Sequence, residues 1–337
     1  MTLILGIETS CDETAIGIVR GGKEILCNQL SSHIDIHQTF GGVFPELSSR
    51  RHFDLLLPLI DRSLKESNIT MDEIDKVAVS YMPGLMGSLL MGINAAKALA
   101  YAYDLPLVPI NHIEAHLYAA MMSEEEFVTP ALGLIASGGH TALVKINSLG
   151  SYEPLATTID DAVGEAFDKV GRLLNLSYPA GPKIEQLARG GDTSAYPFST
   201  KRREGHFTYS GLKTQALYLL KGHNGCSTSP SLLNENDLPH FAASFQEAAL
   251  VQLVDLTLKA AKDHQLSKIY VGGGVSNNRR LRAIFEEKRE TGISVSWPTA
   301  GLSLDNGAMI AGLAYHKEPL SSLFSLTATS TSKKSCL

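Results

Sequence analysis

The sequence has few cysteines, no excess of positive charge and no long uninterrupted apolar run. Its 337 residues include four cysteines, and 29 Lys plus Arg stand against 35 Asp plus Glu, which gives a formal net charge of −6. Such a chain is not a general polyanion binder, so any nucleic acid must meet a local basic patch or be held together with partner proteins. Hydrophobic residues make up 44% and charged residues 19%, which is typical of a compact globular protein with room for two domains.

Secretion and membrane insertion are not indicated. The cysteines lack metal-binding spacing and the N-terminal segment lacks the basic start of a secretion signal, which favours free thiols in the cytosol. Residues 85–103 are apolar but contain Gly87, Gly92, Asn94 and Lys97, which favours a buried helix over a membrane span. We therefore expect a cytoplasmic protein with no membrane contact.

Two short segments that lie far apart in the chain resemble each other. Residues 3–8 and 14–20 have the composition of strands around a polar turn, and residues 132–145 repeat that pattern. At a constant offset, five pairs are identical: Leu5 and Leu132, Gly6 and Gly133, Ser10 and Ser137, Thr14 and Thr141, and Ala15 and Ala142. Chance agreement is one explanation. The other is an internal duplication that gives two related domains, each opening with a hairpin whose turn faces a shared cleft.

Helical and strand periodicities alternate along the rest of the chain, which predicts α/β layers. We expect helices at 51–67, 87–103, 113–122, 160–174, 181–189, 239–264, 277–289 and 305–316, and strands at 76–80, 107–110, 268–271 and 294–297. Residues 190–205 and 222–237 are polar and are predicted to be loops. The predicted domains are 1–128 and 129–302, with a last helix at about 303–318 that packs back on the first domain, and a poorly ordered tail at 319–337.

The stretch from Asn111 to His116 carries the clearest chemistry. On a helix, residues four apart lie on one face, so His112 and His116 can converge on one cation, although a pair of core or surface histidines would look the same. A zinc protease would need Glu directly after the first His, and that residue is Ile113. Glu114 stands about 200° around the helix from His112 and is predicted to point away from the metal face.

Asp305 is the best third ligand. It precedes the last predicted helix, where it could also serve as the N-cap, and one carboxylate has oxygens for both roles. Two imidazoles and one carboxylate leave open coordination positions, which is the pattern of a catalytic site that suits iron or zinc.

Three glycine-rich stretches could bring backbone N–H groups to a phosphate. They are 137–139, 179–182 and 272–274, and the last follows a predicted strand and precedes a helix. None matches the P-loop or GxGxxG, and each alone is weak. Together with the repeated hairpin they favour an adenine nucleotide in a cleft between two domains.

Asp168 lies in a predicted helix with Asp161 and Glu165 at helical spacing, so the three should form one acidic face. That face could be merely solvated, or one of its carboxylates could accept hydrogen bonds from ribose hydroxyls. The spacing alone does not decide between them.

Taken together, the ordered motifs resemble those of the TsaD family, also called Gcp or YgjD. The stretches that carry the resemblance are LGIETSCDETA, HQTFGGVFPELSSR, NHIEAH, SGGHT, DDAVGEAFDKVGRLL, YPAGP, GGGVSNNRRLR and DNGAMIAG. They run from the first strand to about His316, and their number and order make the similarity specific.

The resemblance implies an α/β fold of the actin-like, hexokinase-like class (ASKHA), with two duplicated RNase H-like domains around a cleft. It implies transfer of threonylcarbamoyl from threonylcarbamoyl-AMP to N6 of adenosine 37 in tRNAs that read ANN codons (t6A formation), with release of AMP. Members of the family work with the protein partners TsaB and TsaE.

The resemblance also implies particular site residues. His112, His116 and Asp305 match the ligands of one divalent metal, with Fe²⁺ favoured and Zn²⁺ as the alternative. The positions that match the adenylate-binding residues are Ile135, Ala136, Ser137, Gly138, Gly139, Asp168, Gly181, Glu185 and Asn278. No general base is assigned, and Asp12 and Glu13 in the first turn are the candidates.

Two other functions of the same fold class compete with this one. A sugar or acetate kinase would need ATP and Mg²⁺ but no paired histidines, and an ATP-dependent scaffold would bind ATP without group transfer to tRNA. The densest basic cluster is Lys201–Arg203, with His206 and Lys213 nearby, and it is either a tRNA contact or a solvated loop.

Overall fold

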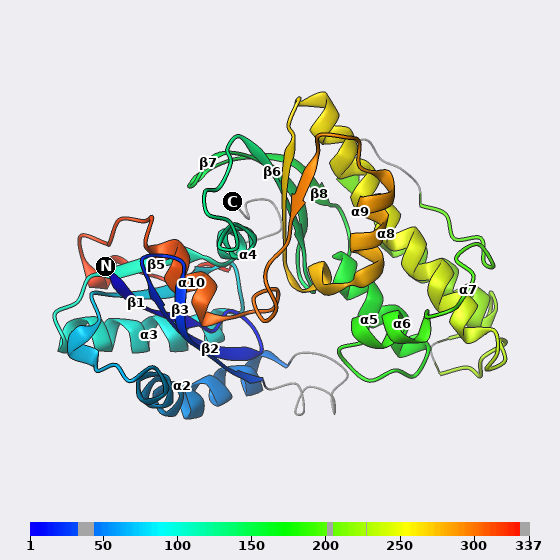
Figure 1. Ribbon diagram of the computed structural model, residues 1–337. Coiled ribbons are helices and arrows are strands. Elements are labelled where there is room, and N and C mark those ends of the chain that lie inside the picture. Colours follow the sequence, from blue (N-terminus) through cyan, green and yellow to red (C-terminus); the bar gives the residue numbers. More distant parts are fainter. Residues whose placement is uncertain (33–43, 201–204, 227, 331–337) are drawn as a thin grey trace. The chain divides into compact units, whose positions relative to one another are not determined.

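The computed structural model describes residues 1–32, 44–200, 205–226 and 228–330 of the chain. These residues form two compact units, each built around one mixed β-sheet (Figure 1). Unit 1 comprises Met1–Phe127 and Trp297–Leu337, and unit 2 comprises Val128–Ser296. The chain therefore leaves unit 1, builds all of unit 2 and returns to complete unit 1.

The sheet of unit 1 has the strand order β3-β2-β1-β4-β5, in which β1, β2 and β3 are antiparallel neighbours and β4 and β5 run parallel to β1. The strands are β1 (Leu3–Glu8), β2 (Glu13–Arg20), β3 (Glu24–Ser32), β4 (Lys76–Met82) and β5 (Leu107–Asn111). The helices are α2 (Pro45–Ser67), η1 (Met71–Glu73), α3 (Met86–Ala102), α4 (His112–Met121), α10 (Gly307–Ala314) and η3 (Leu323–Ser325).

The two faces of β1 meet different helices because successive side chains of a strand point to opposite sides. Leu5 and Ile7 belong to the buried cluster formed with residues of α2 and α3, which pack against each other and the sheet (Figure 1). Gly6 faces α10, where a Cβ atom would lie 2.5 Å from the backbone nitrogen of Ala311. On β2, a Cβ at Gly17 would lie 2.3 Å from the nitrogen of Ala308. Glycine on both strands thus lets α10 lie directly on the sheet.

The sheet of unit 2 has the order β11-β10-β6-β7-β8-β9. Its strands are β6 (Ala131–Ala136), β7 (Thr141–Ser148), β8 (Ser151–Thr158), β9 (His206–Phe207), β10 (Lys268–Gly272) and β11 (Ser294–Ser296). Its helices are α5 (Val163–Leu173), α6 (Gly181–Leu187), α7 (Ser210–Lys221), α8 (Leu238–Asp263), η2 (Gly274–Asn277) and α9 (Arg279–Lys288).

The two sheets repeat one plan. In both, an antiparallel hairpin is followed by a third antiparallel strand, and two later strands then add in parallel on the other side of the first strand. Unit 2 adds only β9 at its edge. The repeated hairpin seen in the sequence is β1–β2 in unit 1 and β6–β7 in unit 2, and it opens each sheet.

The sequence pattern located most of the longer elements but missed strands β3, β8 and β9, helix α7 and the short helices η1, η2 and η3. Strands β3 and β8 mix polar and apolar side chains without a clean period. The segment after Pro319 was expected to be poorly ordered, yet Leu326 is buried in the core of unit 1 and its carbonyl accepts a hydrogen bond from Lys97. Across the described ranges, every helix falls short of the length and apolar character needed to cross a membrane.

Candidate metal centre and nucleotide-binding residues

Helix α4 begins where it does because Asn111 caps it. The Asn111 side-chain oxygen accepts hydrogen bonds from the backbone nitrogens of Ile113, at 2.8 Å, and Glu114, at 3.3 Å. His112 is therefore the first helical residue and His116 lies one turn later on the same face. Both are buried, and their ring centroids are 4.6 Å apart.

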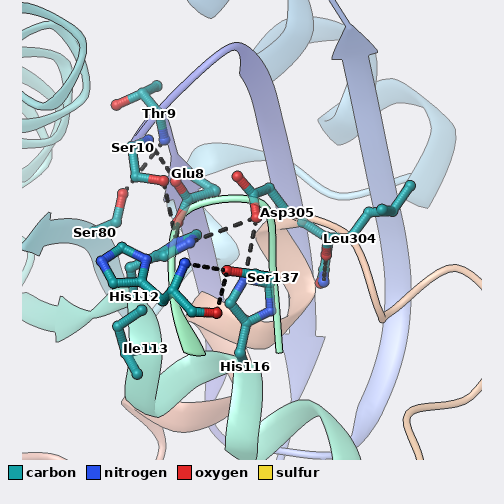
Figure 2. A network of polar contacts seen from close by, with 12 residues as sticks. Glu8, Thr9, Ser10, Ser80, His112, Ile113, His116, Ser137, Leu304 and Asp305 are labelled. Carbon is teal, nitrogen blue, oxygen red and sulfur yellow. Dashed lines mark hydrogen bonds and ion pairs between the residues drawn. The ribbon is translucent and has the colours of Figure 1, made fainter. Parts of the chain in front are cut away.

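Asp305 completes a group of three possible ligands. Its Oδ1 lies 3.1 Å from Nε2 of His116 and 3.5 Å from Nε2 of His112, so both imidazoles direct the same ring nitrogen to one carboxylate oxygen (Figure 2). One ligand atom from each residue lies within 4.8 Å of the other two. Two nitrogens and one oxygen at this spacing fit a divalent transition metal with open coordination positions.

The N-cap of α10 is Asn306 and not Asp305. The Asn306 side-chain oxygen accepts a hydrogen bond from the backbone nitrogen of Met309 at 2.8 Å, so the capping role considered for Asp305 was wrong. Because its neighbour satisfies the helix end, the Asp305 carboxylate can turn to the imidazoles.

Glu8 and Ser10 orient one of the two imidazoles. Oε2 of Glu8 lies 2.9 Å from Nδ1 of His112, and Oγ of Ser10 lies 3.2 Å from the same nitrogen (Figure 2). When the ring is neutral and donates Nδ1–H to the Glu8 carboxylate, the lone pair of Nε2 lies on the Asp305 side and can bind a metal. Nδ1 of His116 is buried and has no hydrogen-bond partner within the described part of the chain.

The charges around His112 change its pKa and that of a neighbouring acid. Burial alone lowers the pKa of His112, but the charges of Glu8 and Asp305 outweigh it and raise the value to about 9. Burial and then the charges of Asp305 and Asp12 raise the pKa of Glu13 to about 8. Several carboxylates thus share one buried region, which favours a cation there.

Glu114 does not take part in this group. Its Oε1 lies 2.6 Å from Nζ of Lys317, and the Glu114 side chain is buried. The prediction that Glu114 points away from the metal face is in keeping with this ion pair. The arrangement lacks the glutamate that a zinc protease places directly after its first histidine.

Glu8 and Ser10 were not predicted from the sequence as part of the site. Glu8 ends an otherwise apolar strand and is fully buried. A buried charge is almost always paired, so a lone acid at the end of a core strand is the signal that could have identified it.

In unit 2, the candidate nucleotide residues begin at the turn after β6. Ile135 and Ala136 are buried strand residues, whereas Gly138 and Gly139 are exposed. The turn is closed by a 2.9 Å hydrogen bond from the backbone nitrogen of Ser137 to the carbonyl of His140. A Cβ at either glycine would meet no atom within 4 Å, so the backbone is open to a ligand.

The segment that leads to α9 lies near this turn in unit 2. Gly273 has φ of 91°, and a Cβ there would lie 2.5 Å from the carbonyl oxygen of Ala136, so the segment leading to α9 packs on the end of β6. Asn278 then caps α9 by accepting from Leu281 nitrogen at 3.1 Å. Oε1 of Glu185, on α6, accepts from the backbone nitrogen of Arg279 at 2.9 Å.

Asp168 and Gly181 belong to the same region. Oδ1 of Asp168 accepts from the backbone nitrogen of Ala180 at 2.7 Å, which ties α5 to the start of α6. Gly181 opens α6, and a Cβ there would meet nothing within 4 Å. The candidate residues of unit 2 therefore come from one set of contacting elements.

The predicted acidic face of α5 was wrong. Asp161 precedes the helix, which begins at Val163, and both Asp161 and Glu165 form ion pairs with Lys169 at 2.6 and 2.9 Å. Only Asp168 turns to α6. Of the basic cluster, Lys201–Arg203 lies outside the described residues, and Lys213 stands 4.0 Å from Asp161.

The fold class follows from the two duplicated sheets and from solved structures. Full-length HypF in its phosphate- and nucleotide-bound form matches with a TM-score of 0.59 at 17% identity, over 93% of this chain and 46% of that one. Component A of the (R)-2-hydroxyglutaryl-CoA dehydratase of Acidaminococcus fermentans gives 0.55 at 13% identity, over 94% and 97%. The chain has the actin-like (ASKHA) fold, with a candidate metal centre in one of its two units.

Sequence relatives identify the family. The model of the tRNA N6-adenosine threonylcarbamoyltransferase family, TsaD, matches residues 24–312. The protein of that name from Protochlamydia amoebophila (strain UWE25) is 50% identical over 322 residues, 94% of this chain and 93% of the relative. The one from Bacillus subtilis (strain 168) is 43% identical over 312 residues, 91% and 88%. The chain belongs to the tRNA N6-adenosine threonylcarbamoyltransferase family, which confirms the family predicted from its motifs.

Proposed function

We propose that this protein transfers the threonylcarbamoyl group from threonylcarbamoyl-AMP to N6 of adenosine 37 in tRNAs that read ANN codons, and releases AMP. Membership of the family supports the reaction class. The convergence of His112 and His116 with Asp305, which lies 189 residues after His116, is the single observation that carries it to this chain. A kinase or a scaffold of the same fold gives no reason for this convergence.

His112, His116 and Asp305 would hold one divalent metal, with Fe²⁺ favoured and Zn²⁺ as the alternative. When bound, such an ion supplies Lewis-acid polarisation of a carbonyl. Glu8 acts through His112, because its carboxylate fixes the ring and keeps Nε2 available as a ligand. Removing Glu8 would therefore weaken metal binding without removing a ligand.

The unit 2 residues suit a nucleotide. The backbone of the 137–139 turn offers N–H groups to the phosphate, and its two glycines leave the approach open. Asp168 and Glu185 each accept a hydrogen bond from a backbone N–H, and carboxylates are also the acceptors that suit ribose hydroxyls. Asn278 is held rigidly as a helix cap and contributes to the nucleoside site.

The transfer itself exchanges one bond for another. N6 of the tRNA adenosine attacks the carbamoyl carbon, the bond from that carbon to the phosphate oxygen breaks, and AMP leaves with the electron pair while N6 loses a proton. An exocyclic amine of adenine is a weak nucleophile, so most of the rate must come from positioning and charge stabilisation. Rigidly held side chains such as His112 and Asn278 suit that task.

Protein partners would compensate for the acidic character of this chain. We expect the substrate tRNA to be bound together with TsaB and TsaE, since a net charge of −6 disfavours wide contact with a polyanion. Helix α2 exposes Phe53 and Leu57, one turn apart and 73% and 65% accessible, and α3 exposes Met86 and Leu90. Contiguous exposed apolar side chains mark protein contacts, and we propose that TsaB binds to these two helices.

Substitution on α2 tests this docking surface. The double variant Phe53→Glu, Leu57→Glu should lose binding to TsaB in a pull-down, while Leu232→Glu on unit 2, which is 67% accessible, should retain it. Equal binding by both variants would remove these helices from the proposed interface.

The reaction is tested by incubating the metal-loaded chain with threonylcarbamoyl-AMP and unmodified tRNA, with and without the two partner proteins. Mass analysis of the tRNA nucleosides should reveal threonylcarbamoyl-adenosine and an equal amount of released AMP. Hydrolysis of ATP without any modified nucleoside, in every combination of components, would instead indicate the scaffold or kinase function.

A further inference from the structure

Helix α8 carries a buried amide side chain, Gln246, to which the proposed reaction gives no role. Gln246 is only 6% exposed, and its Oε1 accepts a 2.9 Å hydrogen bond from Nδ2 of Asn278. Helices α8 and α9 pack against each other in unit 2 (Figure 1). The Oε1 atom of this buried amide therefore has a partner, Asn278, and the role of its Nε2 group is the open question.

The direction of this hydrogen bond is fixed by the helix cap. The backbone N–H of Leu281 can only donate, so the atom of Asn278 that faces it must be the side-chain oxygen. The Asn278 side chain then offers only N–H groups on its other end, and Gln246 must meet them with its oxygen. The Nε2 group of Gln246 is thereby turned away from Asn278.

That Nε2 group is a donor available to a bound molecule. It makes no hydrogen bond to the residues of unit 2 that the structure describes. It is also not among the described unpartnered polar atoms that are sealed from solvent. Gln246 as a whole is held in place by burial, while its Nε2 donor stays accessible, so a bound molecule can supply the acceptor.

The residues on either side of Gln246 contact α5 and α9, and they hold Gln246 between these two helices. Phe245 packs against Phe167, the residue before Asp168, with ring centroids 5.2 Å apart. Glu247 forms a bidentate ion pair with Arg280, at 2.7 and 2.9 Å. Consecutive residues of α8 thus contact α5 beside Asp168 and α9 beside Asn278, which preorganises the amide.

We propose that Gln246 is a further substrate-binding residue, whose Nε2 donates a hydrogen bond to a ring nitrogen of the adenine base. This rests on the proposed function, because it takes the adenylate as the ligand of unit 2. Carboxylates such as Asp168 and Glu185 accept hydrogen bonds and suit ribose hydroxyls. An amide NH₂ only donates, and the ring nitrogens of adenine only accept.

Deaza analogues of AMP test this assignment one atom at a time. The 1-, 3- and 7-deaza forms each replace one ring nitrogen by C–H. The wild-type chain should bind one of the three about tenfold more weakly than AMP, by calorimetric titration. Gln246→Met should bind AMP about tenfold more weakly than the wild type does, and should bind that one analogue and AMP equally.

Two variants serve as comparisons. Gln246→Glu keeps an acceptor for Asn278 but loses the donor. Its added charge acts equally on all four nucleotides, so it should also lose the discrimination among them. If Gln246→Met does not fold, Gln246→Glu still tests whether the Nε2 donor contacts the base. Gln252→Met makes the same change further along α8, where the amide pairs with both backbone groups of Thr208, and should discriminate as the wild type does.

The proposal fails if the wild type binds all three analogues as tightly as AMP, or if Gln246→Glu retains the wild-type discrimination. The latter would mean that Gln246 only supports Asn278. If the wild type binds AMP and Asp168→Ala weakens that binding, these outcomes overturn the role of Gln246 alone. If the wild type does not bind AMP, the nucleotide assignment of unit 2 fails as well.

Discussion

The candidate metal centre of unit 1 and the candidate nucleotide-binding residues of unit 2 differ in their chemistry. In unit 1 the important groups are side chains that carry charge, and they already contact one another, as in the approach of Asp305 to both imidazoles. In unit 2 most of them are backbone N–H groups, glycines and amides, and the two carboxylates, Asp168 and Glu185, each accept a hydrogen bond from a backbone N–H at a helix start.

This difference suggests how each part responds to change. A cluster of mutually interacting charges is sensitive to the loss of any one member and to pH, because each charge sets the pKa of the others. A surface of backbone and glycine is sensitive to added bulk and largely indifferent to pH. Substitutions in the two units, and changes of pH, test this contrast.

Loss of a metal ligand should have the largest effect. His112→Ala or Asp305→Ala should lower metal affinity and transfer by more than about 100-fold, since even partners of ligands cost 10- to 100-fold. Metal content can be measured by plasma mass spectrometry and transfer by nucleoside analysis. His316→Gln is the matched control, because His316 lies in unit 1 but bonds to Tyr118. Full transfer by a metal-free His112→Ala protein would refute the metal centre.

Loss of the negative charge of Glu8, which contacts His112, should have the second-largest effect on metal binding. Glu8→Gln keeps the shape and an acceptor oxygen but not the charge, so metal affinity should fall by about 10- to 100-fold while the fold is retained. Ser10→Ala removes a longer, neutral contact of 3.2 Å and should cost less. A chelator competition assay measures both, and an equal effect of the two substitutions would contradict the orienting role of the carboxylate.

The pH dependence of metal binding should be of intermediate size. The pKa of His112 in the metal-free protein is raised to about 9, so at pH 7 the ring is protonated and a metal must displace that proton. Affinity should therefore rise by about tenfold per pH unit below that pKa and level off near it. In Glu8→Gln the pKa is lower, so the rise should end at a lower pH. Affinity that is constant from pH 6.5 to 7.5 would refute this.

Two glycines of unit 2 should respond oppositely to the same substitution. Gly181→Ala adds a methyl group into open space and should leave stability within about 0.5 kcal/mol, yet weaken AMP binding by roughly fivefold if the ligand lies there. Gly273→Ala introduces a side chain at φ of 91° and against the Ala136 carbonyl, and should destabilise the fold by about 1–3 kcal/mol. Thermal unfolding and AMP titration of both variants distinguish the roles. Unchanged AMP binding by Gly181→Ala would remove Gly181 from the site.

The sequence predicted those parts of the candidate site that depend on the spacing of residues along one helix. The four-residue spacing of His112 and His116 needs only helical geometry, and the match of the DNGAMIAG stretch to the family supports Asp305 as the third ligand. The repeated hairpin indicated two related domains that each open with a hairpin, and both sheets of the structure do so.

Other features depend on contacts that no local pattern encodes. The pairing of Glu8 with His112 joins residues 104 positions apart, and that of Gln246 with Asn278 joins two helices. The capping of α10 by Asn306 instead of Asp305 was missed because both residues are good caps and only the packing of the helix decides between them.

The return of the chain to unit 1 has a consequence for biosynthesis. His116 and Asp305 are 189 residues apart, so at about 5–20 residues per second a ribosome needs roughly 10 to 40 seconds to make the carboxylate after the imidazoles. Throughout that time the nascent chain has two histidines without their third partner. The complete set of candidate ligands therefore forms only after codon 305 has been translated, and a message truncated before that codon would yield a protein without the third candidate ligand.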